Sequence, residues 1–461
     1  VQIHPLDRCT AKELEEAVGI LKAANKLSEL AFYSSGFADE PDKNVVLNFK
    51  AGTSFERIIR LIGHDPKQKQ SFDARVSLAK AELAEFTWVE DGQVAVCGSD
   101  VVKAIGLLFK TKECVDALGK RGVEDLSLVH VEPWVAGKRH PKMDPDARMF
   151  SAIFFLLKHI DGNPYARPIE GLIGYVDVDS GQVVIEDFGV APIPEADGEY
   201  AANRVESVRD DVKPLEITQP EGASFQVEGQ VIKWQKWQLR VSLNPVEGLV
   251  LHDVRYNDHG RDRSILYRAS LSEMVVPYGD SSPMHSFKHA LDSGETNMGH
   301  MANSLSLGCD CLGEIYYFDN TILKSNGESQ EVENVICLHE EDYGVLWKHT
   351  NMMHPSPSPE VRRSRRLVVS TFHTVGNYEY GFYWYFYQDG TIQMETKLTG
   401  HIGASVVAEG KGTDTSPMVA PMISSPIHQH LFCFRLDFNL DGLDNSVCEM
   451  EVEALPPGPE N

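Results

Sequence analysis

Two histidines separated by one residue, His428 and His430, form the clearest metal-binding pattern in the chain. Alternate residues of an extended segment face the same side, so both imidazoles can reach one metal ion. Imidazole suits copper, zinc, iron or nickel, although two unrelated polar positions on a strand would give the same pattern. No histidine follows His430, so a third histidine ligand must come from upstream or from outside this chain segment.

A candidate general base precedes a Ser-Gly pair in the sequence Asp292-Ser293-Gly294-Glu295. An acid in this position usually caps a turn. If Asp292 is buried, however, the pKa of its carboxyl rises, and the group can take up a proton near neutral pH.

An aromatic run, Tyr378 to Tyr387, follows Asn377. Its simplest interpretation is a packed strand with Phe382, Trp384 and Phe386 on one face.

Cysteine usage is sparse, with eight residues in the chain, too few for a disulfide-stapled scaffold. Cys311 and Cys337 flank a predicted hairpin. A cross-strand disulfide and two reduced core thiols are both open alternatives for this pair.

The composition is that of a globular protein, with 461 residues, 42% hydrophobic residues and a formal net charge of -25. The length predicts two to four domains. The acidic balance argues against nucleic-acid partners, which require a basic surface. The longest apolar run, Met149 to Leu157, is far shorter than the roughly 20 residues of a membrane span, so we expect no membrane span.

Periodicity divides the chain into regions and predicts an α+β fold. Residues 1–95 and 96–205 each form a small α+β domain, with a strand expected at Val45 to Phe49 and a single helix at about Asp100 to Leu118. Residues 206–222 are polar and proline-bearing and are expected to be a linker. Residues 223–461 contain regularly spaced short strands, which indicate a large antiparallel β-sandwich. This last region carries the candidate chemistry.

The order of these motifs resembles the catalytic domain of the copper-containing amine oxidases. In that family the motif Asn-Tyr-Asp/Glu-Tyr surrounds the tyrosine that becomes topaquinone, and the chain matches it once, at Asn377-Tyr378-Glu379-Tyr380. The other matches in chain order are Tyr278, Asp292 to Glu295, Leu307 to Glu314, Cys337 to Asp342, Arg365 to Val368, and His428 to His430. The two small domains before them are similar to the family's two N-terminal domains, so the resemblance covers essentially the whole chain.

The resemblance implies oxidative deamination of primary amines to aldehydes, with O2 reduced to H2O2 and ammonia released. Tyr378 would be the topaquinone precursor, whose quinone carbonyl is the electrophile that forms a Schiff base with the amine. Asp292 would be the general base, and Tyr278 would donate a hydrogen bond to the quinone. Asn377 and Tyr380 would bracket the cofactor.

The resemblance also implies the metal sites and a disulfide. His428 and His430 would be two of three copper ligands, and Cys311 and Cys337 would form the family disulfide. Asp437 matches a ligand of a peripheral site for calcium or another divalent ion.

The family forms homodimers with arms that reach across to the partner, and the segment Lys348 to Arg366 is expected to be such an arm.

One departure from the family concerns the third copper histidine, which lies far beyond the His-x-His pair in the family. The predicted sandwich is also shorter than the family's. We therefore expect the polypeptide to continue beyond this segment and the third histidine to lie outside it.

Two alternative functions stay open. One is a non-catalytic relative with the same architecture, and the other is an oxidase that uses the histidine-bound metal without a quinone. The joint presence of Tyr378, Asp292 and both histidines counts against the first.

Overall fold

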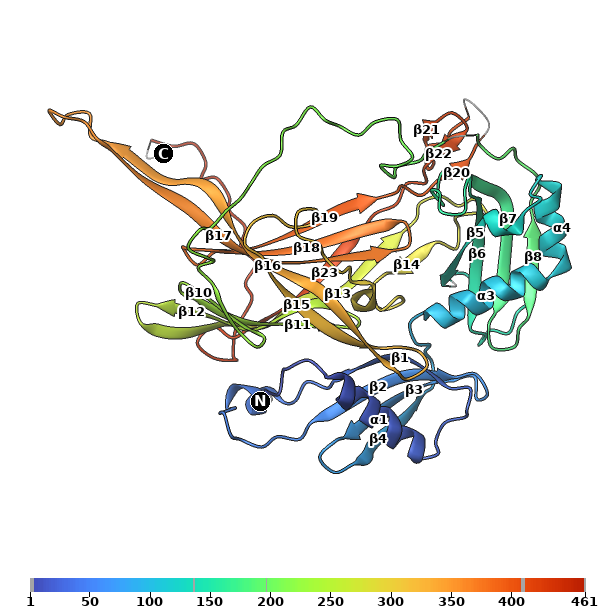
Figure 1. The fold of residues 1–461 in the computed structure, drawn as a ribbon, viewed down its shortest axis with the longest axis horizontal. Helices are drawn as coiled ribbons and strands as arrows, with labels where there is room; N and C mark the ends of the chain where they lie inside the picture. The colour runs from blue at the N-terminus through green and yellow to red at the C-terminus, as the bar shows by residue number, and fades with distance from the viewer. Residues whose placement is uncertain (1–3, 136, 196, 408–410, 460–461) are drawn as a thin grey trace.

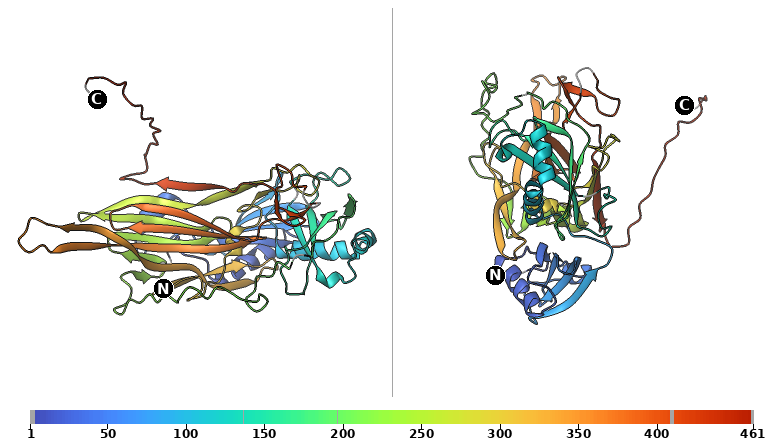
Figure 2. Two further views of the ribbon diagram at one scale, coloured as in Figure 1. Left: turned by 90° about the horizontal axis from the view of Figure 1, so that it is seen from above. Right: turned by 90° about the vertical axis from the view of Figure 1, so that its right-hand side faces the viewer.

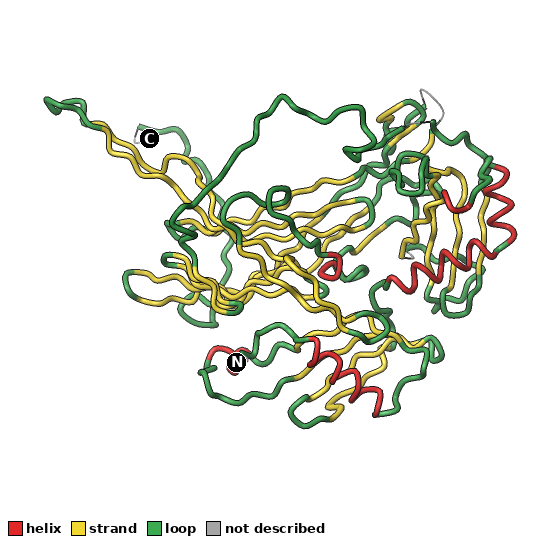
Figure 3. Tube along the Cα trace, in the orientation of Figure 1, coloured by secondary structure: helices red, strands yellow, loops and turns green. Residues whose placement is uncertain are grey.

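The structure is a computed structural model that describes residues 4–135, 137–195, 197–407 and 411–459. The described segments are mostly β, with 23 strands, four α-helices and two short 3-10 helices. Figure 3 shows that the α-helices lie in the N-terminal half of the chain, while strands form the remainder. None of the described helices is long and apolar enough to cross a membrane.

The first unit is a four-stranded antiparallel sheet covered by one helix. Helix α1 (Ala11–Ala23) begins at a capping box, in which the Glu13 amide donates to Thr10 Oγ1 and the Thr10 amide donates to Glu13 Oε2. Its buried face packs against the sheet around Phe72. The sheet order is β1 (Phe32–Ala38), β2 (Ile58–Asp65), β3 (Gln70–Ser77) and β4 (Glu82–Val89).

The strand expected at Val45 to Phe49 is wrong, because helix α2 (Lys43–Leu47) occupies this segment. Val46 of this helix is buried with Leu6 and Tyr267. This packing outweighs the weak β-preference of two adjacent valines.

The second unit is also a four-stranded antiparallel sheet with helices on one face. Its strands, in sheet order, are β5 (Val129–Val135), β6 (Met149–Leu156), β7 (Pro168–Asp177) and β8 (Val183–Asp187). The single helix expected at about Asp100 to Leu118 is two helices, α3 (Gly98–Lys110) and α4 (Lys112–Lys120). Thr111 between them has extended backbone angles, which interrupt the helix. A short 3-10 helix, η1 (Leu126–Leu128), leads into β5.

Two larger sheets enclose the main hydrophobic core, which includes Trp234, Leu251, Trp384 and Phe386. The first sheet contains β9 (Gln226–Glu228), β10 (Val231–Trp234), β11 (Trp237–Asn244), β12 (Gly248–Asp258), β13 (Arg261–Pro277), β14 (His289–Leu291) and β23 (Leu431–Phe438). The second contains β15 (Tyr316–Leu323), β16 (Ser329–Thr350), β17 (Pro359–Val375), β18 (Tyr378–Tyr387) and β19 (Ile392–Gly400). Smaller elements complete this part: η2 (Met298–Met301), β20 (Ser405–Val406), β21 (Met418–Ala420) and β22 (Ile423–Ser424).

The three parts are arranged along an elongated molecule (Figures 1 and 2). The first unit lies below the two large sheets in Figure 1, and the second unit lies at one end of them. At the opposite end, β16 and β17 continue beyond their neighbours as a two-stranded ribbon. The ends of β14, β17 and β18 that face the second unit carry the candidate site.

Candidate active site

Tyr378 lies immediately after a tight hairpin turn. Strands β17 and β18 are joined by Gly376-Asn377, and Val375 pairs with Tyr378 across the turn. Gly376 has a positive φ of 58°, which glycine adopts without strain at the first central position of such a turn. The Asn377 side chain donates to the His401 carbonyl at 2.7 Å, and the His401 amide donates to the Asn377 carbonyl at 2.7 Å. The turn therefore fixes where the Tyr378 ring begins.

Asp292 directly follows β14 and is buried, with 8% of its surface exposed. Its amide donates to the Met274 carbonyl at 2.9 Å, which anchors it to β13. The Tyr380 hydroxyl donates to Asp292 Oδ2 at 3.1 Å, and the same hydroxyl lies 3.0 Å from Nδ1 of His430. A continuous hydrogen-bonded path thus joins the carboxylate to one of the two histidines.

His428 lies against two tyrosines. Its ring stacks on Tyr278 with a centroid separation of 4.3 Å and an interplanar angle of 8°, and the two residues form an isolated antiparallel bridge. The Tyr378 hydroxyl lies 2.8 Å from His428 Nε2. The histidine pair sits just before β23, which pairs with β13, so the same sheet positions Tyr278, His428 and His430.

Burial controls the charge of these groups. It raises the pKa of Asp292 from 3.8 to about 7, an effect opposed by the hydrogen bond from Tyr380 and supported by the nearby charges of Glu295 and Glu273. Burial also raises the pKa of Tyr278, and the interaction with Tyr378 adds to it. An aspartate with this proton affinity can act as a base near neutral pH.

A cavity of about 190 Å³ opens over these groups. Tyr378, Asn377, Tyr278 and Asp292 line it together with Trp134 from β5 of the second unit. Six site residues predicted from sequence are thereby collected at one place, namely Tyr278, Asp292, Asn377, Tyr378 and Tyr380 with the adjoining His428, and His430 completes the set through Tyr380.

Comparisons with known proteins agree with this arrangement. The family model for the copper amine oxidase enzyme domain matches residues 226–461. The chain is 42% identical over 453 residues to a primary amine oxidase of Arthrobacter sp. (strain P1), covering 98% of this chain and 69% of that protein.

The chain belongs to the copper amine oxidases. It is 41% identical over 464 residues to a histamine oxidase of Arthrobacter globiformis, covering 99% of this chain and 67% of that protein. A solved structure of a copper-containing benzylamine oxidase from Hansenula polymorpha superposes with a TM-score of 0.86 at 28% identity, covering 95% of this chain and 71% of that one. The chain thus spans about two thirds of the length of these curated relatives.

As a copper amine oxidase, the protein depends on copper and topaquinone. It deaminates primary amines oxidatively to aldehydes, with O2 reduced to H2O2 and ammonia released.

The donor set in this copper amine oxidase suits copper. Nδ1 of His428 lies 2.9 Å from the Pro426 carbonyl, which can only accept, so Nδ1 carries the proton and Nε2 keeps its lone pair. Because Tyr380 donates to Asp292, it accepts from Nδ1 of His430, which also leaves Nε2 free. Burial lowers the pKa of His428 and lowers that of His430 to about 4, so both rings are in the neutral form that binds metals.

A third ligand does not accompany the pair. Among the described residues, no group of three or more His, Cys, Asp or Glu side chains is arranged to hold a metal ion. The third copper histidine expected outside this segment therefore stays a prediction.

The peripheral site expected at Asp437 is not formed. Its carboxylate makes an ion pair with Lys43 at 2.6 Å, so a lysine ammonium holds the place a divalent cation would need. No metal-binding group of three lies around it in the described part of the chain.

The two cysteines predicted to pair lie together without a bond. Cys311 and Cys337 are both free thiols in the structure, and both are buried in one small cluster with Leu305. Each thiol perturbs the pKa of the other through a direct sulfur contact, which lowers that of Cys311 and raises that of Cys337. The arrangement is thus that of adjacent reduced thiols, and the disulfide stays a prediction.

Sequence reasoning missed several groups that surround the site. Trp134 and Glu132 of β5 line the cavity, and the Trp134 indole donates to Glu132 at 3.0 Å. Lys288 is buried, with its ammonium 5.0 Å from the Trp134 ring centre and 5.7 Å from that of Tyr278. Burial lowers the pKa of Lys288 to about 8. Only Glu295 carried a sequence signal, because it ends the motif that begins at Asp292.

Proposed function

We propose that Asp292 is the general base of this amine oxidase and that Tyr378 is the residue converted to topaquinone. The observation that carries the proposal is a buried carboxylate with a pKa near 7 in the same cavity as a tyrosine whose hydroxyl touches a histidine. When formed, the quinone supplies an electrophilic carbonyl for the amine and an acceptor for its electrons.

The role of Asp292 is to remove a proton from the carbon that bears the amine. Low exposure keeps water from solvating the carboxylate, so its basicity stays high enough for carbon deprotonation. The donated hydrogen bond from Tyr380 orients Oδ2 and leaves Oδ1 without a hydrogen bond from the described side chains. Oδ1 is therefore the oxygen that we assign to proton transfer.

The surrounding groups hold the reactive ring and the metal. Tyr278 interacts with the Tyr378 hydroxyl and is fixed by its stack on His428, which supports its role as hydrogen-bond donor to the cofactor. Asn377 and Tyr380 lie on either side of Tyr378 in sequence and anchor the turn and the base. We assign Nε2 of His428 and Nε2 of His430 as copper ligands.

The domain plan and assembly are part of the same proposal. We assign residues 1–95 and 96–205 as the two N-terminal α+β domains, 206–222 as the linker and 223–461 as the catalytic β-sandwich domain. We also propose a homodimer, because the β16–β17 ribbon exposes large apolar side chains beyond the edge of its sheet.

Two substitutions test the site. Tyr378→Phe should abolish the visible quinone absorption and amine-dependent H2O2 release in copper-loaded protein. Asp292→Asn should keep the absorption but lower kcat by at least 10³-fold, the upper range of general-base effects. Tyr383→Phe is the matched control, since it removes a hydroxyl from the same strand on the side away from the cavity.

The alternative function predicts a different result. H2O2 release that persists in Tyr378→Phe would overturn the assignment and favour a metal oxidase without a quinone. Loss of absorption in Tyr383→Phe would show that the effect is structural.

A further inference from the structure

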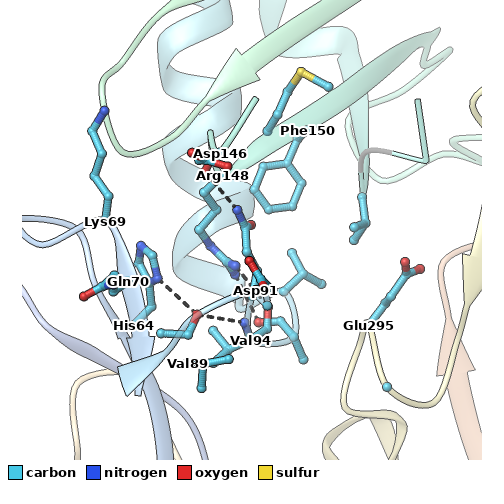
Figure 4. Close-up of a pocket in the computed structure, with 18 of the residues that line it drawn as sticks. His64, Lys69, Gln70, Val89, Asp91, Val94, Asp146, Arg148, Phe150 and Glu295 are labelled. Atoms are coloured by element: carbon cyan, nitrogen blue, oxygen red, sulfur yellow. Dashed lines mark hydrogen bonds between the residues drawn. The ribbon is translucent and has the colours of Figure 1, made fainter. Parts of the chain in front are cut away.

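A second, larger cavity adjoins the one over Asp292. It has a volume of about 550 Å³ and is lined by the first unit, the second unit and the loop after β14. In Figure 4, His64, Lys69 and Gln70 lie on one side of it and Glu295 lies on the other. Val96, Val135 and Glu295 line both cavities, so the two spaces share one wall.

Glu295 is held at this shared wall by the backbone. Its carboxylate accepts from the Leu291 amide at 2.9 Å, and its own amide donates to the Leu291 carbonyl at 2.8 Å. The Val96 amide donates to the Glu295 carbonyl at 2.7 Å, which ties the wall to the segment that joins the first two units. Three residues before Glu295 lies Asp292, so the loop places one carboxylate in each position along the path.

The charges along the larger cavity favour a cation. Of its three basic lining residues, Arg148 is paired with Asp100 at 2.6 Å and Lys69 faces Asp144 at 3.7 Å. Arg139 donates to the Ala147 carbonyl. The acidic lining residues are Glu90, Asp91, Asp146 and Glu295, and none of them makes an ion pair within the described part of the chain.

We propose that the amine substrate reaches Asp292 through this larger cavity and that Glu295 binds its ammonium group at the wall between the two spaces. This inference rests on the proposed function, because it concerns the access route to the same base. Primary amines are mostly protonated at neutral pH, so a carboxylate on the route offsets part of the cost of taking the cation out of water. Burial raises the pKa of Glu295, as expected for a carboxylate held away from water without a basic partner.

Glu295→Gln tests the binding role. The amide oxygen can still accept from the Leu291 amide, so the substitution removes the charge and keeps the structural contact. We expect KM for benzylamine to rise about 5- to 10-fold with kcat changed less than 2-fold, and the dependence of kcat/KM on ionic strength to weaken. Glu82→Gln, an exposed carboxylate on β4 outside both cavities, should match the unchanged protein.

Binding can be measured without catalysis. Calorimetric titration of benzylammonium into copper-free protein, in which Tyr378 is unmodified, should give a Kd several-fold higher for Glu295→Gln than for the Glu82→Gln control. An unchanged Kd would overturn the assignment of Glu295.

The route itself is tested by closing the larger cavity. Gln93 lines only this cavity and donates to the carbonyls of Asp146 and Ala147 across it. Gln93→Trp should lower kcat/KM for benzylamine at least 10-fold, and Lys67→Trp, on the neighbouring turn outside the cavity, should not. Thermal unfolding of both variants separates blockage from misfolding.

The outcomes distinguish this inference from the proposed function. If Asp292→Asn is inactive while Gln93→Trp and Glu295→Gln behave like the unchanged protein, the access route is wrong and the base is unaffected. If the unchanged protein releases no H2O2 with any amine, the proposed function fails, while the calorimetric comparison still reports on Glu295.

Discussion

Asp292 is buried and receives one side-chain hydrogen bond, so its proton affinity sets the pH range in which it can act as a base. Its pKa of about 7 lies above the ordinary value of 3.8. Below pH 7 the carboxyl is protonated and cannot accept a proton, so kcat/KM should fall about tenfold per pH unit on the acid side. A pH profile of kcat/KM with a neutral-pH break, absent from the residual activity of Asp292→Asn, is the expected result. A break at pH 4 would contradict it.

Tyr380 links the base to a copper ligand, and its hydroxyl has two separate effects. Its hydrogen bond lowers the pKa of Asp292 against the effect of burial. Tyr380→Phe should therefore move the acid-side break of kcat/KM to higher pH by roughly 0.5–1 unit, because a lost hydrogen bond to a charged group is worth about 1.5–3 kcal/mol before relaxation. The same variant leaves Nδ1 of His430 without its partner, so copper should be released faster to a chelator. Unchanged values for both would show that the hydroxyl is only a packing group.

Much of the candidate site could be predicted from the sequence at the scale of single residues, because a motif that bears chemistry also constrains the backbone around it. The Asn-Tyr-Glu-Tyr segment places Tyr378 after a turn and Tyr380 on the same face of the strand. Asp437 failed because its environment depends on Lys43, nearly four hundred residues earlier in the chain, which no local pattern reveals.

The β17–β18 hairpin is the element on which the position of Tyr378 depends. Gly400 on the neighbouring strand pairs with Tyr378 and has a φ of 99°, and a Cβ there would lie 2.6 Å from the Asn377 carbonyl. Gly400→Ala should therefore destabilise the protein by about 1–3 kcal/mol and lower the yield of quinone per subunit. Urea unfolding and visible absorption measure the two effects.

A matched control lies three residues further along the chain. A Cβ on Gly403 would meet only the Tyr278 hydroxyl at 3.9 Å, an ordinary contact. Gly403→Ala should consequently leave stability and quinone yield unchanged. Equal loss in both alanine variants would show that backbone flexibility near His401, rather than the close approach at Asn377, sets the position of the tyrosine.

At the scale of elements, the sequence predicted long strands well and short or interrupted elements poorly. The alternating pattern of the large sheets is enforced by one buried face, so it is visible in the sequence. The α2 helix depends on contacts of Val46 with distant residues, and the break at Thr111 falls inside a continuous apolar pattern. Both features are decided by tertiary packing, which local propensity does not contain.

At the scale of the whole molecule, the cavity over Tyr378 is assembled from separate parts of the chain. Strand β5 of the second unit contributes Trp134 and Glu132, and the large sheets contribute Asp292 and Tyr378. Packing between these parts was not encoded in any motif spacing, which is why the tryptophan wall and Lys288 were found only in the structure. The second unit is consequently a wall of the site as well as a folded body of its own.

Dimer formation is the prediction that belongs to this largest scale. The β16–β17 ribbon carries exposed apolar side chains, with Leu346 57% and Trp347 50% exposed. A two-stranded ribbon is at best marginally stable by itself, and covering these side chains against a second copy would stabilise it by about 1.5–3 kcal/mol for each. In a symmetric dimer every such residue counts twice, so replacing both with serine should raise the dimer Kd at least 100-fold. Light scattering coupled to size-exclusion chromatography measures this change. Val102→Ser, at an exposed apolar residue of α3, should leave the mass unchanged, and a doubly substituted ribbon that still supports a dimer would place the interface on another face.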